Sequence, residues 1–314
     1  MVADETLFRL FRDYFALYLP KMRECSRHTI RSYRSAINSL LDFVKAENNI
    51  ELDKVTLNML TDRTVVKFLE SLKDNGNSAS TRALRLSCIK AFFSYAADVE
   101  PTTVFNAGKI AKIEIGKEAK HKLIDYLSEN AIKILLEQPD PTTEKGLRDV
   151  FLLLLMYDTA ARLQEIRNIT LRDITWNKEV SVTLHGKGSK IRVVPLMKPT
   201  IEHLNNYLKV FHPEYNRYTS FYEESFLFYV IQHSQRNPIS DSAVRKLIRG
   251  YGDNAKVFCN EFPDIVHPHL IRHSRAMHLY QHGMDLSLVQ QWLGHAQIET
   301  THIYYDKQVF MLSA

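Results

Sequence analysis

Strand-forming sequence is confined to one short stretch of this chain, and this restriction limits its fold more than any other feature. Between residues 180 and 195, aliphatic and β-branched residues stand on both sides of the turn sequence Gly-Lys-Gly-Ser, as they do in a β-hairpin. They are Val182, Leu184, Ile191, Val193 and Val194. Elsewhere apolar residues recur three and four positions apart, which is the spacing of helices. We therefore expect a mainly α-helical fold with a small antiparallel β-sheet.

Helical periodicity fills the first hundred residues. Apolar residues keep helical spacing over 7–18 and 30–44, and again over Val65–Leu72 and Thr81–Ala96. The sequence Asn75-Gly-Asn-Ser separates the last two segments as a turn. Four helices with short connections indicate a small helical bundle.

The 314 residues are long enough for two domains, each with its own core. After the helical segments, a lysine-rich stretch from 99 to 122 shows little apolar periodicity. We expect a helical domain over 1–98, a basic linker over 99–122 and a second domain over 123–314.

The second domain also has helix signals. Ser128 is a plausible N-cap for a helix over Glu129–Glu137, and a buried helix is expected over Leu147–Asp158. The segment from Asp285 is amphipathic, and Gly294 is expected to end it in a left-handed conformation.

Composition is that of an ordinary soluble protein, with 45% hydrophobic and 25% charged residues. The net charge of +5 does not by itself separate a DNA-binding protein from a slightly basic enzyme. Cys25, Cys88 and Cys259 are odd in number and far apart, which argues against a disulfide framework or a zinc site. The apolar run Val150–Met156 is too short to span a bilayer, and Met1 leads into acidic and polar residues rather than a secretory signal. We expect a cytoplasmic protein.

The side chains that carry chemistry are cationic or phenolic, and carboxylates do not cluster with them. A set of Arg, Lys, His and Tyr suits an anionic substrate, such as a phosphodiester, that is attacked by a protein hydroxyl. The phenol is the nucleophile, the cations hold the anion, and no metal is required. They stand in five short motifs: Thr159-Ala-Ala-Arg-Leu-Gln-Glu165, His185-Gly-Lys-Gly-Ser-Lys190, His267-Pro-His-Leu-Ile-Arg-His273, Leu293-Gly-His295 and Ile303-Tyr-Tyr305.

In their order and spacing these residues resemble the tyrosine recombinases, the integrase and Xer-type family of site-specific DNA strand exchangers. The family pattern is Arg-x-x-Glu, Gly-Lys-Gly, His-x-x-Arg-His, Leu-Gly-His, and a Tyr nine residues later. Here the first element is Arg162 with Glu165, and the third also includes His273. The family usually has Gly where this chain has Ala160, and we expect the added methyl group to tighten local packing.

This resemblance covers about residues 5–308. It implies a SAM-like core-binding domain and a mainly helical catalytic domain with a small antiparallel sheet, the DNA breaking-rejoining fold, closed around DNA. It also implies a 3′-phosphotyrosyl intermediate, strand exchange by the freed 5′-hydroxyl, and a homotetramer on the double-stranded recombination site formed from free monomers. Neither ATP nor a metal cofactor is implied.

The resemblance also suggests individual roles. Arg162 and Arg272 present planar N–H forks to phosphate oxygens. Lys187 protonates the leaving 5′-oxygen, with Lys190 as a nearby competitor. His269 and His295 handle protons or donate to the phosphate, and Glu165 and His273 support the residues that touch it. Tyr304 has the family spacing, and its neighbour Tyr305 is the alternative nucleophile.

Several histidines are also spaced like metal ligands on a helix. The pairs His269/His273 and His278/His282 are each four residues apart, but no His-Glu-x-x-His motif or third-ligand cluster accompanies them. No metal site is expected, and His267, His278 and His282 are interpreted as structural.

A basic stripe on the predicted second helix is a candidate DNA-binding surface. Arg27, Arg31 and Arg34 share one helix face and can neutralise successive phosphates. The family carries a similar Ser-x-x-Thr-x-x-x-Tyr segment against DNA, whereas for an anonymous helix a solvated face is the plainer interpretation. A later helix offers a companion patch: Arg82, Arg85 and Lys90.

Within the family we favour an integrase or transposase of a mobile element, because Arg275 and Met277 depart from the Xer pattern. A chromosome-dimer resolvase of the Xer type, a type IB topoisomerase and a non-catalytic DNA-binding protein on this scaffold are the alternatives. With no arm-binding domain before residue 5, we expect simple-site recombination. The apolar run Val309–Leu312 either docks on a neighbouring protomer or folds back onto its own domain.

Overall fold

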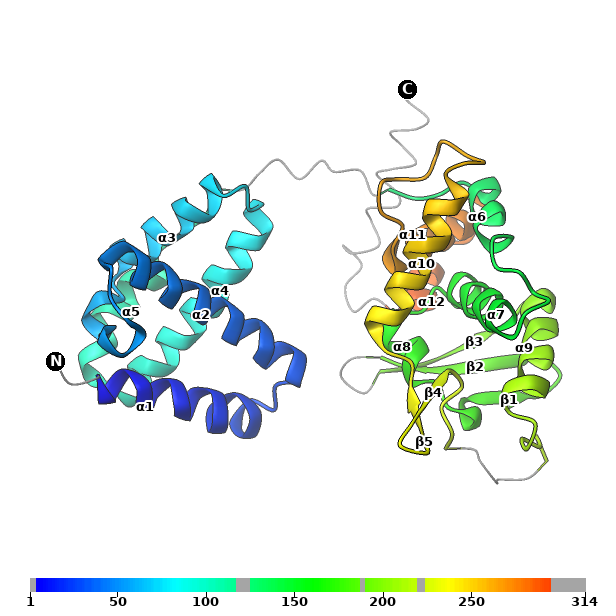
Figure 1. Ribbon diagram of the computed structural model, residues 1–314, viewed down its shortest axis with the longest axis horizontal. Helices are drawn as coiled ribbons and strands as arrows, with labels where there is room; N and C mark the ends of the chain where they lie inside the picture. The colour runs from blue at the N-terminus through cyan, green and yellow to red at the C-terminus, as the bar shows by residue number, and fades with distance from the viewer. Residues whose placement is uncertain (1–3, 117–124, 187–189, 219–223, 295–314) are drawn as a thin grey trace. The chain divides into compact units, whose positions relative to one another are not determined.

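The computed structural model describes residues 4–116, 125–186, 190–218 and 224–294. The chain divides into two compact units, Met1–His121 and Lys122–Ala314, and each unit buries a hydrophobic core of its own (Figure 1). The predicted mainly helical fold with a small antiparallel sheet is confirmed. Within the described ranges, no helix has both the length and the apolarity needed to cross a membrane.

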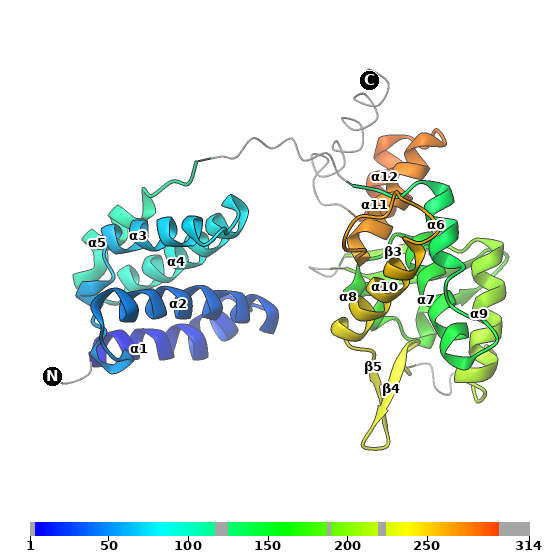
Figure 2. The same cartoon turned by 45° about the horizontal axis from the view of Figure 1, so that its top comes forward.

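The N-terminal unit is a helical bundle (Figure 2). Its helices are α1 (Glu5–Asp13), a π-helical continuation (Tyr14–Met22), α2 (Arg27–Asn48), α3 (Asp62–Asp74), α4 (Ala79–Val99) and α5 (Val104–Ala111). Short 3-10 turns cover Leu52–Lys54, Leu57–Met59 and Pro101–Thr103. The side chains of Ser26, Thr61 and Ser78 cap α2, α3 and α4 by accepting a backbone N–H three residues ahead.

Aromatic side chains fill the centre of this bundle. The fully buried ring of Tyr14 lies with its centroid 5.3 Å from that of Phe92 and 5.1 Å from that of Tyr95. Phe92 also packs against Phe11 from α1 at 4.8 Å. The predicted helices over 65–72 and 81–96 lie inside α3 and α4, and Gly76 takes a positive φ in the turn between them.

The structure differs from the sequence-based prediction at the start of the linker. Residues 99–111 are not an extended connection, because α5 places Ala107 and Ile110 in the core of the N-terminal unit. The Lys90 ammonium group donates to the carbonyl of Ala111 at 2.7 Å and so ties the end of α5 to α4. The helix holds one lysine, Lys109, inside a longer lysine-rich stretch, and its two core positions were too few to signal a helix.

The C-terminal unit is helical around two small sheets. Its helices are α6 (Glu129–Leu136), α7 (Glu144–Thr159), α8 (Leu163–Asn168), α9 (Lys198–Phe211), α10 (Asp241–Ala255), α11 (Pro268–Gln281) and α12 (Leu286–Leu293). Ser128 caps α6, α7 contains the predicted buried helix, and Gly294 ends α12, all as the sequence predicts.

One sheet has three antiparallel strands in the order β1 (Ile174–Trp176), β2 (Val180–His185) and β3 (Ile191–Pro195). The predicted hairpin is β2–β3, and β1 adds a strand that the sequence analysis missed. A second hairpin, β4 (Tyr229–Gln232) and β5 (Gln235–Pro238), was also missed and projects from the body of the unit in both views (Figures 1 and 2). The inner face of the three-stranded sheet contributes Val182, Leu184 and Val194 to the core of this unit.

Candidate active site

The Arg-x-x-Glu motif is the start of a helix. Arg162 is the N-cap residue of α8, and its backbone N–H donates to Glu165 Oε2 at 2.7 Å. The Arg162 guanidinium donates to the other carboxylate oxygen at 3.0 Å. A Glu three residues after the N-cap is the position from which its side chain reaches back to the cap. The spacing in the motif is therefore the spacing at which Glu165 fixes both the backbone and the side chain of Arg162.

Glu165 is buried and also binds a second arginine. Arg192, on β3, donates to both carboxylate oxygens at 2.9 and 2.8 Å, so that the carboxylate accepts four N–H groups in all. Burial raises the pKa of Glu165. The hydrogen bonds and charge of Arg192, together with the backbone N–H and charge of Arg162, lower this pKa by more than burial raises it. The net result is a pKa below the ordinary glutamate value. Glu165 is therefore a buried, ionised anchor for two guanidinium groups.

Arg272, on α11, is almost fully buried. Its two terminal nitrogens donate to the carbonyls of Ala160 and Leu293 at 2.5 and 2.6 Å. These carbonyls lie at the C-terminal ends of α7 and α12, where helix dipoles favour a cation. The structure therefore joins the ends of two helices through the side chain of Arg272.

Ala160 takes a left-handed conformation with φ of 48° at the end of α7. This explains why glycine is usual at that position, since a Cβ strains such a backbone. The expectation that the methyl group tightens packing is incomplete, because the buried methyl packs in a small core cluster while the backbone is strained.

Gly294 brings the end of α12 against the two glutamate-bound arginines. It has a φ of 64°, and its carbonyl accepts a long hydrogen bond of 3.5 Å from Arg162 Nη2. A Cβ at this position would lie 3.1 Å from Arg192 Nη1. Both the backbone conformation and the close approach of Arg192 therefore require glycine immediately before His295.

His269 and His273 lie one helical turn apart on α11, with ring centroids 6.3 Å apart. Loss of water around the ring, and then the charge of Arg272, lower the pKa of His269 below its ordinary value. Burial and the neighbouring His269 lower the pKa of His273 to about 4. Both imidazoles are therefore neutral at pH 7, and each has one ring nitrogen that can donate a hydrogen bond and one that can accept. In the parts of the chain that the structure describes, no three His, Cys, Asp or Glu residues group as metal ligands.

The turn that carries Lys187 begins beside the same glutamate. The Gly186 N–H donates to the Lys190 carbonyl at 2.7 Å, and a Cβ on Gly186 would lie 3.4 Å from Glu165 Oε1. Lys187 itself, like His295, Tyr304 and Tyr305, lies outside the described residues. Their roles stay predictions. The residues directly before Lys187 and His295 in the sequence, Gly186 and Gly294, lie against Glu165 and Arg162 respectively.

Arg192 is the site residue that the sequence analysis overlooked. A signal was present, because Arg192 stands two residues before buried Val194 and pairs with Leu184 across the hairpin. Alternation along a strand therefore places this arginine on the inner face, where an unpaired charge is not tolerated.

The remaining histidines have the structural partners that we expected. His267 caps α11 by accepting the Leu270 N–H at 3.1 Å. His278 Nδ1 lies 2.8 Å from the Tyr157 hydroxyl, and His282 pairs with Glu129 at 2.6 Å.

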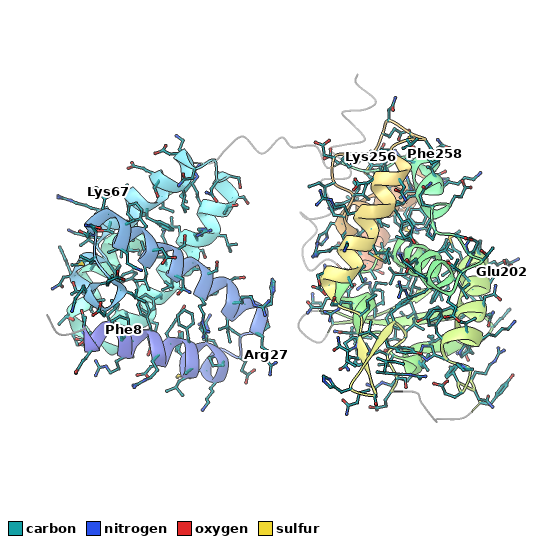
Figure 3. All side chains as sticks on the ribbon, viewed as in Figure 1. Phe8, Arg27, Lys67, Glu202, Lys256 and Phe258 are labelled. Atoms are coloured by element: carbon teal, nitrogen blue, oxygen red, sulfur yellow. The ribbon has the colours of Figure 1, made fainter. Side chains whose placement is uncertain are left out.

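The predicted DNA-contact residues of the N-terminal unit lie on α2 and α4. Arg27, Arg31 and Arg34 are exposed along α2, and Arg27 stands at its amino-terminal end (Figure 3). Arg34 also stacks over the Phe15 ring at 5.2 Å. On α4, Arg82 and Arg85 are half-buried, and Lys90 is half-buried with its ammonium group bound to Ala111. Contact of these side chains with DNA stays a prediction.

Comparison with known proteins identifies the chain. Residues 125–309 match the phage integrase family, and residues 13–99 match the N-terminal SAM-like domain of phage integrases. The first match alone covers more than half of the 314 residues. The chain belongs to the phage integrase family of tyrosine recombinases. The recombinase is therefore an enzyme that cuts and rejoins DNA, as the motif pattern indicates.

Two curated relatives are similar over most of their length. A putative integrase/recombinase, y4rC, of Sinorhizobium fredii is 29% identical over 316 residues, covering 100% of this chain and 92% of the relative. Tyrosine recombinase XerD of Staphylococcus epidermidis is 31% identical over 285 residues, covering 89% of this chain and 88% of the relative. Among solved structures, the XerH site-specific recombinase in a post-cleavage DNA complex has a TM-score of 0.72 at 21% identity. That likeness covers 99% of this chain and 89% of XerH, and it establishes the shared fold.

Proposed function

We propose that the recombinase breaks one DNA strand by attack of the Tyr304 hydroxyl on a phosphodiester, leaving a 3′-phosphotyrosyl link. The Glu165-centred pair of arginines carries the proposal, because one buried carboxylate fixes Arg162 beside both the lysine turn and Gly294. Arg272 helps to fix Gly294 beside Arg162, because its guanidinium donates to the carbonyl of Leu293, the residue before Gly294. Four segments that are distant in the sequence therefore meet around one position suited to bind an anion.

The remaining steps follow from the chemistry of these groups. The arginine forks stabilise the charge that develops on the non-bridging oxygens, and His269 and His295 donate hydrogen bonds or move the tyrosine proton. Lys187 gives a proton to the leaving 5′-oxygen, since an alkoxide leaves poorly. The freed 5′-hydroxyl of a second strand then attacks the phosphotyrosyl bond and releases Tyr304. Because the covalent link keeps the phosphodiester energy, the cycle needs no ATP.

We further propose that the enzyme moves a mobile element and acts as a homotetramer on paired sites. Support comes from Arg275, which departs from the Xer pattern and is built into this fold. Its guanidinium lies 3.5 Å from buried Asp158 and stacks over the Tyr157 ring at 5.1 Å. One relative that covers the whole chain, y4rC, is named a putative integrase/recombinase. Sequencing the DNA that the purified protein retains tests this: element ends support the proposal, and a single chromosomal site favours the dimer-resolvase alternative.

A nicked suicide duplex tests the catalytic assignment. Tyr304→Phe should abolish the covalent protein–DNA adduct on a denaturing gel while leaving duplex binding nearly unchanged, since only one oxygen is lost. Tyr305→Phe is the matched control and should still form the adduct. Loss of the adduct in Tyr305→Phe alone would move the nucleophile to Tyr305. Adduct formation should continue in EDTA, and a requirement for added magnesium would contradict the proposed chemistry.

A further inference from the structure

The two strands that bracket the lysine turn are each tied to a buried carboxylate. On the exit strand β3, Arg192 binds Glu165. On the entry strand β2, the last residue is His185, whose Nε2 lies 2.9 Å from Asp173 Oδ1. The His185 side chain is half exposed, whereas that of Asp173 is 6% exposed. The exposed histidine therefore reaches inward to a fixed, buried partner.

Asp173 is held in place independently of His185. Its second oxygen accepts both the backbone N–H and the hydroxyl of Thr170, each at 2.8 Å. It ends the 3-10 turn Leu171–Asp173, directly before β1. Asp173 is therefore an anchor whose orientation is set by its own turn.

The two ties act on opposite faces of the hairpin. Arg192 pairs with Leu184 across the strands, so both point to the core. His185 follows Leu184, and successive residues of a strand point to opposite faces. Since Arg162, Glu165 and Asp173 lie within one twelve-residue segment of the chain, that segment holds the hairpin from both sides.

We propose that His185, held by Asp173, is a positioning residue that orients the turn carrying Lys187 for proton transfer. The inference deepens the proposed function, because it rests on Lys187 acting as the general acid. Beyond Val182, β2 pairs with β3 alone, so removal of the histidine loosens this end of the hairpin and leaves the Arg192–Glu165 pair as its side-chain tie. Proton donation to the leaving oxygen then suffers, whereas phosphate binding through Arg162 and Arg272 does not.

A change of leaving group separates positioning of an acid from general structural support. A DNA substrate with sulfur in place of the bridging 5′-oxygen releases a thiolate, which leaves without protonation. His185→Ala and His185→Leu should slow cleavage of the oxygen substrate by roughly ten- to a hundredfold, part of the 10²–10⁴-fold that a general acid contributes. Both variants should cleave the sulfur substrate at nearly the wild-type rate. His185→Gln, which keeps an N–H donor, should stay near wild type on both.

Two controls make every outcome informative. Thr183→Ala alters the same face of β2 two residues earlier, leaves the Asp173–His185 pair in place, and should cleave both substrates normally. Lys187→Ala should be slow on oxygen and restored on sulfur. If Lys187→Ala is not restored, the general-acid role of Lys187 is wrong, and with it the role of His185. If Lys187→Ala is restored but the His185 variants are equally slow on both substrates, or normal on both, positioning by His185 is overturned.

Discussion

At the scale of single residues, the site is organised by one acid among many bases. Glu165 is buried, accepts four N–H groups from Arg162 and Arg192, and has a lowered pKa. Two guanidinium groups without this carboxylate would repel each other at the place where a phosphate has to bind. The Glu165 carboxylate therefore holds the two positively charged side chains together, although its own role is to bind the arginines and not the substrate.

Glu165→Gln should destabilise the C-terminal unit by about 3 kcal/mol at pH 7, because it leaves the largely buried guanidinium of Arg192 without its counter-charge. A carboxylate whose folded pKa is lowered stabilises the protein fully above its unfolded pKa, here 4.5, and loses that contribution as pH falls through the folded value. The difference in unfolding free energy between wild type and variant should therefore shrink below pH 4.5. Urea denaturation at pH 7 and at pH 4 measures it, and a difference that does not change with pH would contradict the ionised anchor.

Two left-handed residues should respond differently to exchange between glycine and alanine, with a clear loss at one and a small change at the other. Gly294→Ala adds about 1–2 kcal/mol of backbone strain, and its Cβ presses on Arg192 at 3.1 Å, so both stability and cleavage should fall. Ala160→Gly removes similar strain but also a buried methyl group, worth about 0.8 kcal/mol, so stability should change by about 1 kcal/mol or less. Urea denaturation and suicide-substrate cleavage check both variants. Equal losses at the two positions would show that φ is not the deciding factor.

At the scale of elements, α2 presents the clearest candidate for a backbone-binding surface. Arg27, Arg31 and Arg34 are exposed on it. Each arginine that neutralises a phosphate releases counterions from the DNA, so every such contact makes the affinity fall more steeply as the salt concentration rises.

Arg31→Ala should weaken binding to all DNA sequences alike and reduce the slope of log affinity against log salt by about 0.9, the share of one phosphate. Arg63→Ala removes an exposed arginine from α3, outside the stripe, and serves as the control. Filter binding over a salt series measures both. An unchanged slope for Arg31→Ala would make the stripe an ordinary solvated face.

Elements with a strong local signal were predictable, and those built from tertiary contacts were not. The β2–β3 hairpin is predicted by the aliphatic residues on both sides of a glycine-containing turn. By contrast, β1 has only three residues, Ile174–Trp176, and is a strand because it pairs with Val180–Val182. The β4–β5 turn uses His233 and Ser234 at positive φ, where glycine or asparagine would have given a signal. Likewise, the motif spacing identified Arg162 and Arg272, whereas strand alternation can place Arg192 on the inner face but only the folded structure shows that its partner there is Glu165.

At the scale of the whole molecule, the homotetramer that we propose requires contacts between protomers as well as with DNA. The apolar run Val309–Leu312 is the segment for which we predict such a contact, and it lies outside the described residues.

Deletion of residues 308–314 should leave binding to a single site intact and impair assembly on paired sites. Replacing only Val309–Leu312 by serines in the full chain should have the same effect, which separates lost apolar contact from lost length. Mobility-shift and sedimentation measurements with one and with two sites distinguish the steps. Normal assembly of both variants would indicate that the tail does not dock on a partner.

The separate cores of the two units have a consequence for inheritance. Among the residues that the structure describes, the packing around Tyr14 and Phe92 shares no buried residue with the cluster that contains Phe151 and Phe228. Substitutions that reshape one interior therefore leave the other intact, so selection can act on the two halves at different rates. Exchange of residues 1–121 between relatives by gene shuffling would yield hybrids in which each parental interior is preserved whole.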